Sequence, residues 1–287
     1  MRATRQALDT TTAGRSRLAA RDAVQHLSLR ARVKGIVERS LGVTISRTPP
    51  IPVNGHADAA LRELRQWSPD DVVFDVGAND GRTILRLQPQ LSGPRFYAFE
   101  PVSSTYRILQ ERTGHLPNVR TLRLALGAAA GTGLIHLNPI HAMDSFSPRW
   151  TTSQTGTETV RISTVDEVLE AERIALVHFL KIDTEGYELE VLRGAERSLR
   201  ASRILIVQVE VGVDQMTRPF VPLETARTHM AERGYFLYGL YNQCRTPAFA
   251  PRALSAADDS YRPEVLGYCD ALFIRADLAC QGESSSG

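Results

Sequence analysis

The 287-residue chain has few cysteines, almost no lysine and no long apolar segment. Its three cysteines, Cys244, Cys269 and Cys280, are odd in number and widely spaced, which excludes a disulfide framework and a regularly spaced zinc site. No apolar run reaches the roughly 18 residues that a membrane-spanning helix needs. No apolar block follows the basic N-terminus, as a secretory signal would require. We therefore expect a cytoplasmic protein.

Lysine is rare among the basic residues. Only Lys34 and Lys181 are lysine, and the rest of the 34 basic residues are arginine. Such a bias usually reflects genomic base composition, so a lysine that persists in this background can be there for its chemistry. A compact ammonium and a planar guanidinium are not equivalent. The formal net charge of +2 gives no reason to expect a nucleic-acid partner for the whole chain.

The N-terminal region differs from the rest of the chain. Over residues 1–40 basic residues outnumber acidic ones, and apolar residues recur near helical spacing. Three prolines in residues 48–52 exclude a helix there and indicate a linker. We expect residues 1–55 to be a basic helical extension with a Pro-rich linker. Residues 1–45 would pack on the domain or on a partner, or lie on an anionic membrane surface.

Residues 56–280 alternate between short apolar runs, which are typical of buried strands, and segments with helical spacing. This order predicts a doubly wound α/β fold, with a mostly parallel sheet and right-handed crossovers. The last two strands have no helix between them, so we expect an antiparallel hairpin at the sheet edge. The polar tail 281–287 is expected to be disordered. The expected strands are Val72–Val76, Arg95–Phe99, Val119–Leu126, Val177–Ile182, Ile204–Val209, Tyr235–Leu240 and Tyr268–Ile274.

Residues 131–159 depart from this alternation, with a hairpin arm followed by an irregular loop. Thr164 then caps the next helix, and Glu167 completes a capping box. Further helices are expected over Asp58–Gln66 and Tyr187–Leu199.

The stretch DVVFDVGANDG at 71–81 says most about function, because it places a glycine turn between a strand and a helix. Gly77 and Gly81 have no Cβ, so a ligand can approach the backbone closely. A dinucleotide fold uses G-x-G-x-x-G, which seats a pyrophosphate on the helix N-terminus. Here Asp75 and Asp80 would repel a pyrophosphate. They suit S-adenosylmethionine, which carries an ammonium and a sulfonium cation.

Carboxylates also follow three of the expected strands, as Glu100, Asp183 and Glu210. In an open α/β sheet, ligands bind beyond the carboxyl ends of the strands. Glu100 comes about twenty residues after the glycine turn, where an acid can accept hydrogen bonds from both hydroxyls of a ribose. The alternative for each acid is that it caps the helix that follows.

Four motifs resemble, in matching order, the FkbM family of S-adenosylmethionine-dependent methyltransferases. They are FDVGANDG at 74–81, YAFEP at 97–101, STVDEVL at 163–169 and LKIDTEGYELEVLRGAE at 180–196. The resemblance implies the class I methyltransferase fold, which is Rossmann-like, and transfer of a methyl group to a hydroxyl of a sugar or natural product. It also implies that the methionine end of the cofactor is lined by Asp75, Gly77, Asn79 and Gly81, the ribose held by Glu100, and the adenine flanked by Ala125 and Leu126.

Methyl transfer to an alcohol requires an aligned nucleophile and a base or metal ion that deals with the hydroxyl proton. Asp183 is our first catalytic candidate, as a base, a metal ligand or a substrate clamp. Glu185 follows in the same tight turn, where it could instead complement a helix dipole. His141 lies in the irregular loop and is a third candidate, since an imidazole titrates near working pH. Asp183 and Glu210 together offer oxygen ligands for Mg²⁺.

The sequence therefore predicts an O-methyltransferase that acts on a hydroxyl of a sugar, a glycoside or a polyketide-type natural product. Its partner would be a small-molecule or glycan acceptor. A nicotinamide-dependent oxidoreductase and a catalytically silent scaffold that binds the cofactor are the alternatives. Residues 131–159 and the C-terminal third, which lie outside the strongest motifs, are expected to shape the acceptor site.

Overall fold

The computed structural model describes residues 55–139, 144–147, 154–213, 220–247 and 264–280. The described residues all belong to one compact unit, Pro52–Gly287. Almost all of the predicted N-terminal extension and the whole tail 281–287 lie outside the described residues, so both remain predictions. Within the described part, no helix is long and apolar enough to cross a membrane.

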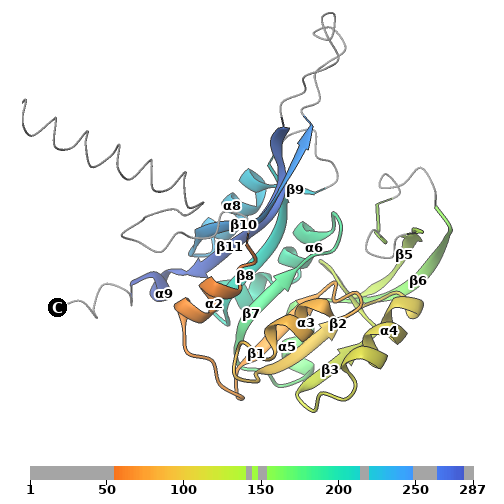
Figure 1. Cartoon of the computed structure of the whole chain (residues 1–287), viewed down its shortest axis with the longest axis horizontal. Helices are drawn as coiled ribbons and strands as arrows, with labels where there is room; N and C mark the ends of the chain where they lie inside the picture. The colour runs from red at the N-terminus through yellow and green to blue at the C-terminus, as the bar shows by residue number, and fades with distance from the viewer. Residues whose placement is uncertain (1–54, 140–143, 148–153, 214–219, 248–263, 281–287) are drawn as a thin grey trace, which may run out of the picture. The chain divides into compact units, whose positions relative to one another are not determined.

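The main sheet of the described residues has eight strands, in the order β10-β11-β8-β7-β1-β2-β3, with β9 beside β8 (Figure 1). The neighbours β3, β2, β1, β7 and β8 pair in parallel, whereas β11 is antiparallel to β8 and β10 is antiparallel to β11. The predicted parallel sheet with an antiparallel C-terminal edge hairpin is thereby confirmed. The strands are β1 Val72–Val76, β2 Arg95–Phe99, β3 Val119–Leu122, β7 Val177–Ile182, β8 Ile204–Gly212, β9 Val221–Pro222, β10 Tyr235–Pro247 and β11 Glu264–Arg275.

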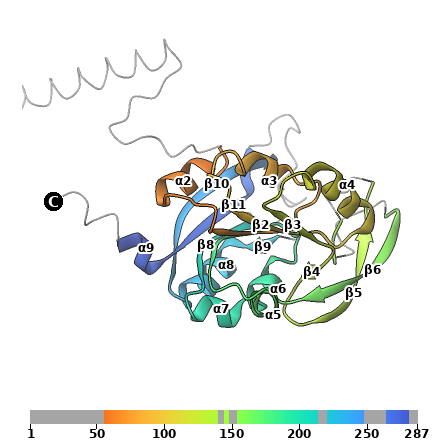
Figure 2. The same cartoon turned by 90° about the horizontal axis from the view of Figure 1, so that it is seen from below.

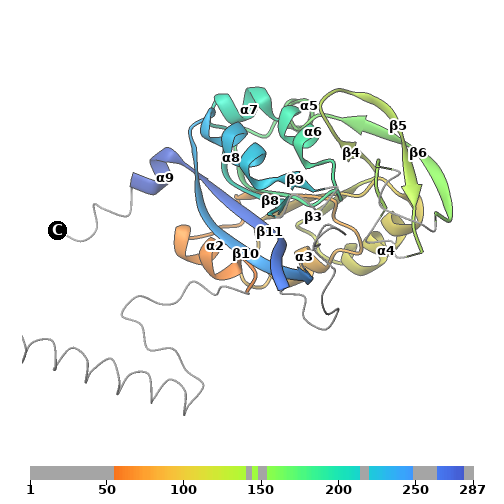
Figure 3. The same ribbon diagram turned by 90° about the horizontal axis from the view of Figure 1, so that it is seen from above.

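Helices cover both faces of the main sheet, because successive residues of each buried strand point to opposite sides. In β1, Phe74 enters one apolar core and Val73 enters the other. Figures 2 and 3 show the two helical layers with the sheet between them. One layer holds α2 Asp58–Leu64, α3 Arg82–Leu87 and α4 Ser103–Thr113, and the other holds α5 Val165–Ala171, α6 Glu188–Arg193, α7 Glu196–Arg200 and α8 Leu223–Ala231. A short helix, α9 Ala276–Cys280, follows β11.

A second, three-stranded sheet corrects one prediction. The segment Val119–Leu126 was expected to be one strand, but β3 ends at Leu122 and Ala125–Leu126 forms β4. The chain turns between them, where the Leu124 amide donates a hydrogen bond to the Leu122 carbonyl at 3.0 Å. β4 then pairs with β6 Gly156–Ser163, which also pairs with β5 Gly131–Leu137. The sequence of this segment does not reveal that the chain changes its pairing partner after Leu122.

The expected helix Tyr187–Leu199 is also two helices, α6 and α7. Gly194 lies between them, and a Cβ added there would sit 2.0 Å from the Gly127 carbonyl oxygen. Asp166 of α5 accepts hydrogen bonds from the amides of Arg197 and Ser198, both at 2.9 Å, so a neighbouring helix caps the start of α7. The predicted capping box at the start of α5 is present.

Candidate active site

The carboxyl ends of β1 and β7 form the crevice of the sheet. After β3 the chain returns to place β7 beside β1, and this reversal of strand order marks the ligand site of a doubly wound fold. Gly77 follows β1 with φ +78°, and a Cβ there would lie 1.8 Å from the Asp183 carbonyl oxygen. Only glycine therefore allows the two strand ends to approach this closely.

Gly81 has a packing role that its motif did not imply. Its φ is +83°, and an added Cβ would lie 2.8 Å from the Thr113 side chain and 3.0 Å from that of Leu109. Gly81 thus lets α3 pack against α4. It does not line either of the two hollows described below.

The first hollow lies between the glycine turn, the end of β2 and β4, and it encloses about 570 Å³, open solvent included. Several predicted cofactor residues line it together with apolar side chains. Its lining residues include Gly77, Asn79, Phe99, Glu100, Ala125, Leu126, Asp183 and Glu185.

Glu100 is the buried acid of the first hollow. Its Oε2 accepts a hydrogen bond from the Asn79 amide at 3.1 Å, and its Oε1 accepts one from the Val102 amide at 2.9 Å. Burial raises the pKa of Glu100 to about 7, although both backbone donors act in the opposite direction. The carboxylate is therefore fixed in position, and its charge depends on pH near neutrality.

A second hollow also borders the glycine turn. It is lined by the turn itself, by the start of α3 and by Lys181. Gly77, Asn79 and Asp183 line both hollows, so the two meet at these three residues.

Asp75 does not line either hollow, although the resemblance implied a cofactor contact. Its carboxylate is buried, 3.4 Å from the Lys181 ammonium. Burial opposes the charged form of Lys181, yet the Asp183 and Asp75 carboxylates raise its pKa above the ordinary value. Asp75 thus lies beneath the site and contacts it through Lys181.

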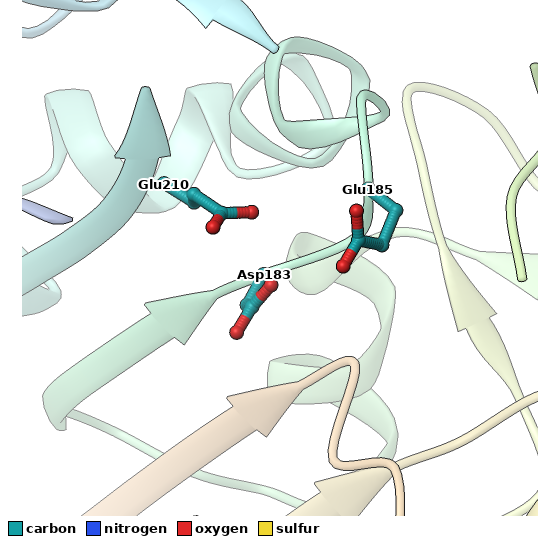
Figure 4. Close-up of side chains that lie close together, drawn as sticks. All are labelled: Asp183, Glu185 and Glu210. Atoms are coloured by element: carbon teal, nitrogen blue, oxygen red, sulfur yellow. The ribbon is translucent and has the colours of Figure 1, made fainter. Parts of the chain in front are cut away.

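Asp183, Glu185 and Glu210 gather in one cluster (Figure 4). Each has a carboxylate oxygen within 4.8 Å of an oxygen of the other two. Burial, together with the neighbouring acids, raises the pKa of Glu185 to about 8 and that of Glu210 to about 11. Such carboxylates can hold a cation or exchange protons with a ligand. The predicted pair for Mg²⁺, Asp183 and Glu210, lies together here, and the metal itself stays a prediction.

Two residues that the sequence did not single out shape the turn at 183–186. Glu188 accepts hydrogen bonds from the amides of Thr184 and Gly186, and the Ser145 hydroxyl donates to the Glu185 carbonyl at 2.7 Å. Glu185 itself has φ +54°, which is uncommon for a residue with a side chain. In the sequence Glu188 looks like any acid at a helix start, and Ser145 like any loop serine.

The loop after β5 reaches the first hollow, as its place in the sequence predicted. Asp144, Ser145 and Phe146 line the hollow, and the Phe146 ring lies 4.4 Å from that of Tyr187. His141, our third catalytic candidate, lies outside the described residues and remains a prediction.

The chain is similar to known methyltransferases. Residues 75–237, more than half of the chain, match the model of the methyltransferase FkbM domain. Hexuronic acid methyltransferase AglP of Haloferax volcanii is 30% identical over 163 residues, which are 56% of this chain and 65% of that protein. The chain thus matches less than two thirds of the length of this relative.

Two of the similar solved structures were determined with a bound ligand. TrmK of M. capricolum, in complex with S-adenosylhomocysteine, has a TM-score of 0.42 and 10% identity over 78% of this chain and 69% of its own. Fibrillarin of Aeropyrum pernix, with bound S-adenosylmethionine, has a TM-score of 0.40 and 14% identity over 76% and 73%.

Proposed function

The chain belongs to the FkbM methyltransferase family, and from this premise we propose that it transfers the methyl group of S-adenosylmethionine to a hydroxyl of a sugar or a polyketide-type natural product. The observation that carries the proposal is the meeting of the two hollows at Gly77, Asn79 and Asp183. A cofactor made of an adenosine and a methionine, joined at a sulfonium, matches two hollows that share one junction.

The residues of each hollow fit one part of this cofactor. Glu100 offers a buried carboxylate to the ribose hydroxyls, and Phe99, Ala125 and Leu126 offer apolar surface to the adenine. The second hollow combines polar groups of both signs, among them Asp80 and Lys181, which suit an amino-acid end. Asp183 lines the junction, where a carboxylate favours a cation. Asp75 and Gly81 act as support.

When bound, S-adenosylmethionine supplies a methyl group that its sulfonium makes electrophilic. The protein has to hold an acceptor hydroxyl in line with that group and remove the hydroxyl proton. We propose Glu185 for the proton, because its side chain lines the hollow and the bonds at Thr184, Gly186 and its own carbonyl fix its turn. Backbone in a rare conformation that neighbours hold in place is common at functional sites. Asp183 would stabilise the cation, and His141 remains an additional candidate base.

A Glu185→Gln variant tests this assignment, since glutamine keeps the shape and loses the proton acceptor. Turnover should fall at least about tenfold, within the range of general base catalysis. The affinity for S-adenosylhomocysteine should stay unchanged. Unaltered turnover would move the role to Asp183 or His141.

A glycan acceptor is supported by the relative, which by its name acts on a hexuronic acid. A screen with isotope-labelled S-adenosylmethionine and mass spectrometry should therefore include neutral glycosides, uronic-acid glycosides and polyketide alcohols. Transfer to oxygen in any of them supports the proposal. Transfer to nitrogen, carbon or nucleic acid would replace it.

Calorimetry with S-adenosylhomocysteine tests the cofactor directly. Binding below millimolar concentration is expected, and no binding at millimolar ligand would refute the assignment. The nicotinamide-dependent alternative finds no support in family membership, and NADH fluorescence on mixing provides its check. A silent scaffold would bind the cofactor and methylate no acceptor in the screen.

The Mg²⁺ prediction for Asp183 and Glu210 needs its own experiment, with Glu185 as a third oxygen donor. After dialysis against a chelator, activity should return on addition of Mg²⁺. Full activity without added metal would exclude the ion from the reaction.

A further inference from the structure

Lys181 contacts two carboxylates, the buried one of Asp75 and the partly exposed one of Asp183. It lies on β7 directly opposite Asp75 of β1, and only 6% of it is exposed. Its Nζ donates a hydrogen bond to Asp183 Oδ2 at 3.0 Å and lies 3.4 Å from Asp75 Oδ1. One ammonium therefore serves both a deep carboxylate and a carboxylate at the ligand site.

Asp75 depends on this ammonium. It is 1% exposed, and among the described residues no group donates a hydrogen bond to either of its carboxylate oxygens. A buried carboxylate without compensation is strongly unfavourable. Burial accordingly raises the pKa of Asp75, while Lys181 and, more weakly, Arg86 oppose that shift.

Asp183 is held in a different way, because its side chain is 37% exposed and lines both hollows. The bond to Lys181 restrains one oxygen from below and leaves the rest of the carboxylate facing the crevice. Lys181 also lines the second hollow, so the residue belongs both to the proposed ligand site and to the core.

The choice of lysine fits this double contact. Arginine supplies all but two of the basic residues of the chain. A guanidinium is broad and planar, whereas an ammonium presents a compact charge with donors in three directions. One carboxylate on β1 and one directly after β7, 3.4 and 3.0 Å from the same nitrogen, fit the compact group.

We propose that Lys181 is a positioning residue, which balances the charge of Asp75 and holds the Asp183 carboxylate toward the sulfonium of the cofactor. This inference rests on the proposed function and adds a property to it. A correctly held Asp183 should favour the cationic S-adenosylmethionine over the neutral product S-adenosylhomocysteine, which eases product release.

Charge-matched variants separate the two tasks of Lys181. Lys181→Met leaves two carboxylates without their ammonium, whereas Asp75→Asn combined with Lys181→Met keeps the net charge of the wild-type trio. Melting temperature and the dissociation constants of both ligands would be measured for each variant and for Asp183→Asn. Lys181→Arg asks whether charge alone is enough.

We expect Lys181→Met to lower the melting temperature and the double variant to restore it, together with the affinity for S-adenosylhomocysteine. The ratio of the two dissociation constants should nevertheless show a weaker preference of the double variant for S-adenosylmethionine, equal to that of Asp183→Asn. We expect a change of about fivefold or less, because the contact involves a partly exposed charge. Lys181→Arg should not recover that preference.

Three outcomes would overturn the inference. A double variant with the wild-type preference would make Lys181 a counter-charge only. A Lys181→Met protein with unchanged stability would show that Asp75 needs no such partner. A wild-type protein that binds neither ligand would refute the proposed function and with it the positioning role. In that case, the melting temperature of the double variant would still show whether Lys181 balances the charge of Asp75.

Discussion

The two sides of the crevice solve different problems. On the β2 side, Glu100 is buried and each of its oxygens accepts a backbone hydrogen bond, among apolar neighbours such as Phe99 and Leu126. On the β7 and β8 side, three carboxylates lie within 4.8 Å of one another, and neighbouring Lys181 bonds only Asp183 among them. On the first side the buried carboxylate is already hydrogen-bonded. The second side is electrostatically unfavourable until a cation or protons arrive, as a reaction centre can be.

The largest effect should come from the glycine on which both sides depend. Gly77→Ala places a Cβ against the Asp183 carbonyl at a positive φ, so the strand ends must separate. We expect a loss of about 3 kcal/mol or more of unfolding free energy and no measurable cofactor binding. Chemical denaturation and calorimetry would measure these. Gly131→Ala is the control, because a Cβ there meets nothing within 4 Å; equal effects of the two changes would refute the close-approach argument.

The next effect concerns only the β2 side of the crevice, which holds Glu100. Glu100→Ala removes the ribose acceptors, and hydrogen bonds to a charged group contribute roughly 1.5–3 kcal/mol each. The affinity for S-adenosylhomocysteine should fall about a hundredfold, as calorimetry would show. An unchanged affinity would mean that the ribose lies elsewhere.

The pH dependence of binding sharpens the same point. With a pKa of about 7, Glu100 is mostly charged at pH 8 and mostly neutral at pH 6. Because the charged form accepts both ribose hydroxyls, binding of S-adenosylhomocysteine should be about tenfold weaker at pH 6 than at pH 8. Glu100→Gln should bind more weakly and show a flat profile. A flat wild-type profile would remove Glu100 from the ribose site.

A last prediction tests whether the acidic side is electrostatically strained. The pKa of Glu210 is raised to about 11, so its contribution to stability is present at low pH and is lost as pH rises above the ordinary range of a glutamate. Glu210→Gln should therefore gain stability over the wild type with increasing pH. At pH 8, with a chelator present, each kcal/mol gained would raise the melting temperature by about 2–4 °C.

Glu224→Gln serves as the control for this comparison, because Glu224 is exposed on α8. Its melting temperature should follow the wild type at every pH. A Glu210 variant that is less stable than the wild type at pH 8 would show that the carboxylate contributes favourable contacts and that the acidic side is not strained.

Features of the fold and of the site could be predicted wherever the residues that form them are close together in the sequence. The strand–turn–helix at 71–87, the acid after β2 and the capping box at Thr164 all depend on short spacing, and each lies where it was predicted. The predicted strand Val119–Leu126 and helix Tyr187–Leu199 were wrong in their continuity. Their breaks depend on distant partners, namely β6 and Asp166.

The roles within the site divide in the same way. The sequence by itself determined the family, the sheet with its antiparallel edge, and the acids after β2 and β7, since periodicity and motif order record local backbone and burial. The predicted end of β8 at Val209 was wrong, because the strand continues to Gly212 and Glu210 lies inside it. Only the tertiary structure decided that Gly77 touches β7 while Gly81 serves α4, that Asp75 lies beneath Lys181, and that Glu185 joins Asp183 and Glu210. Those contacts come from strands that the fold brings together from distant parts of the chain, and their energies depend on burial and charge in that assembled crevice.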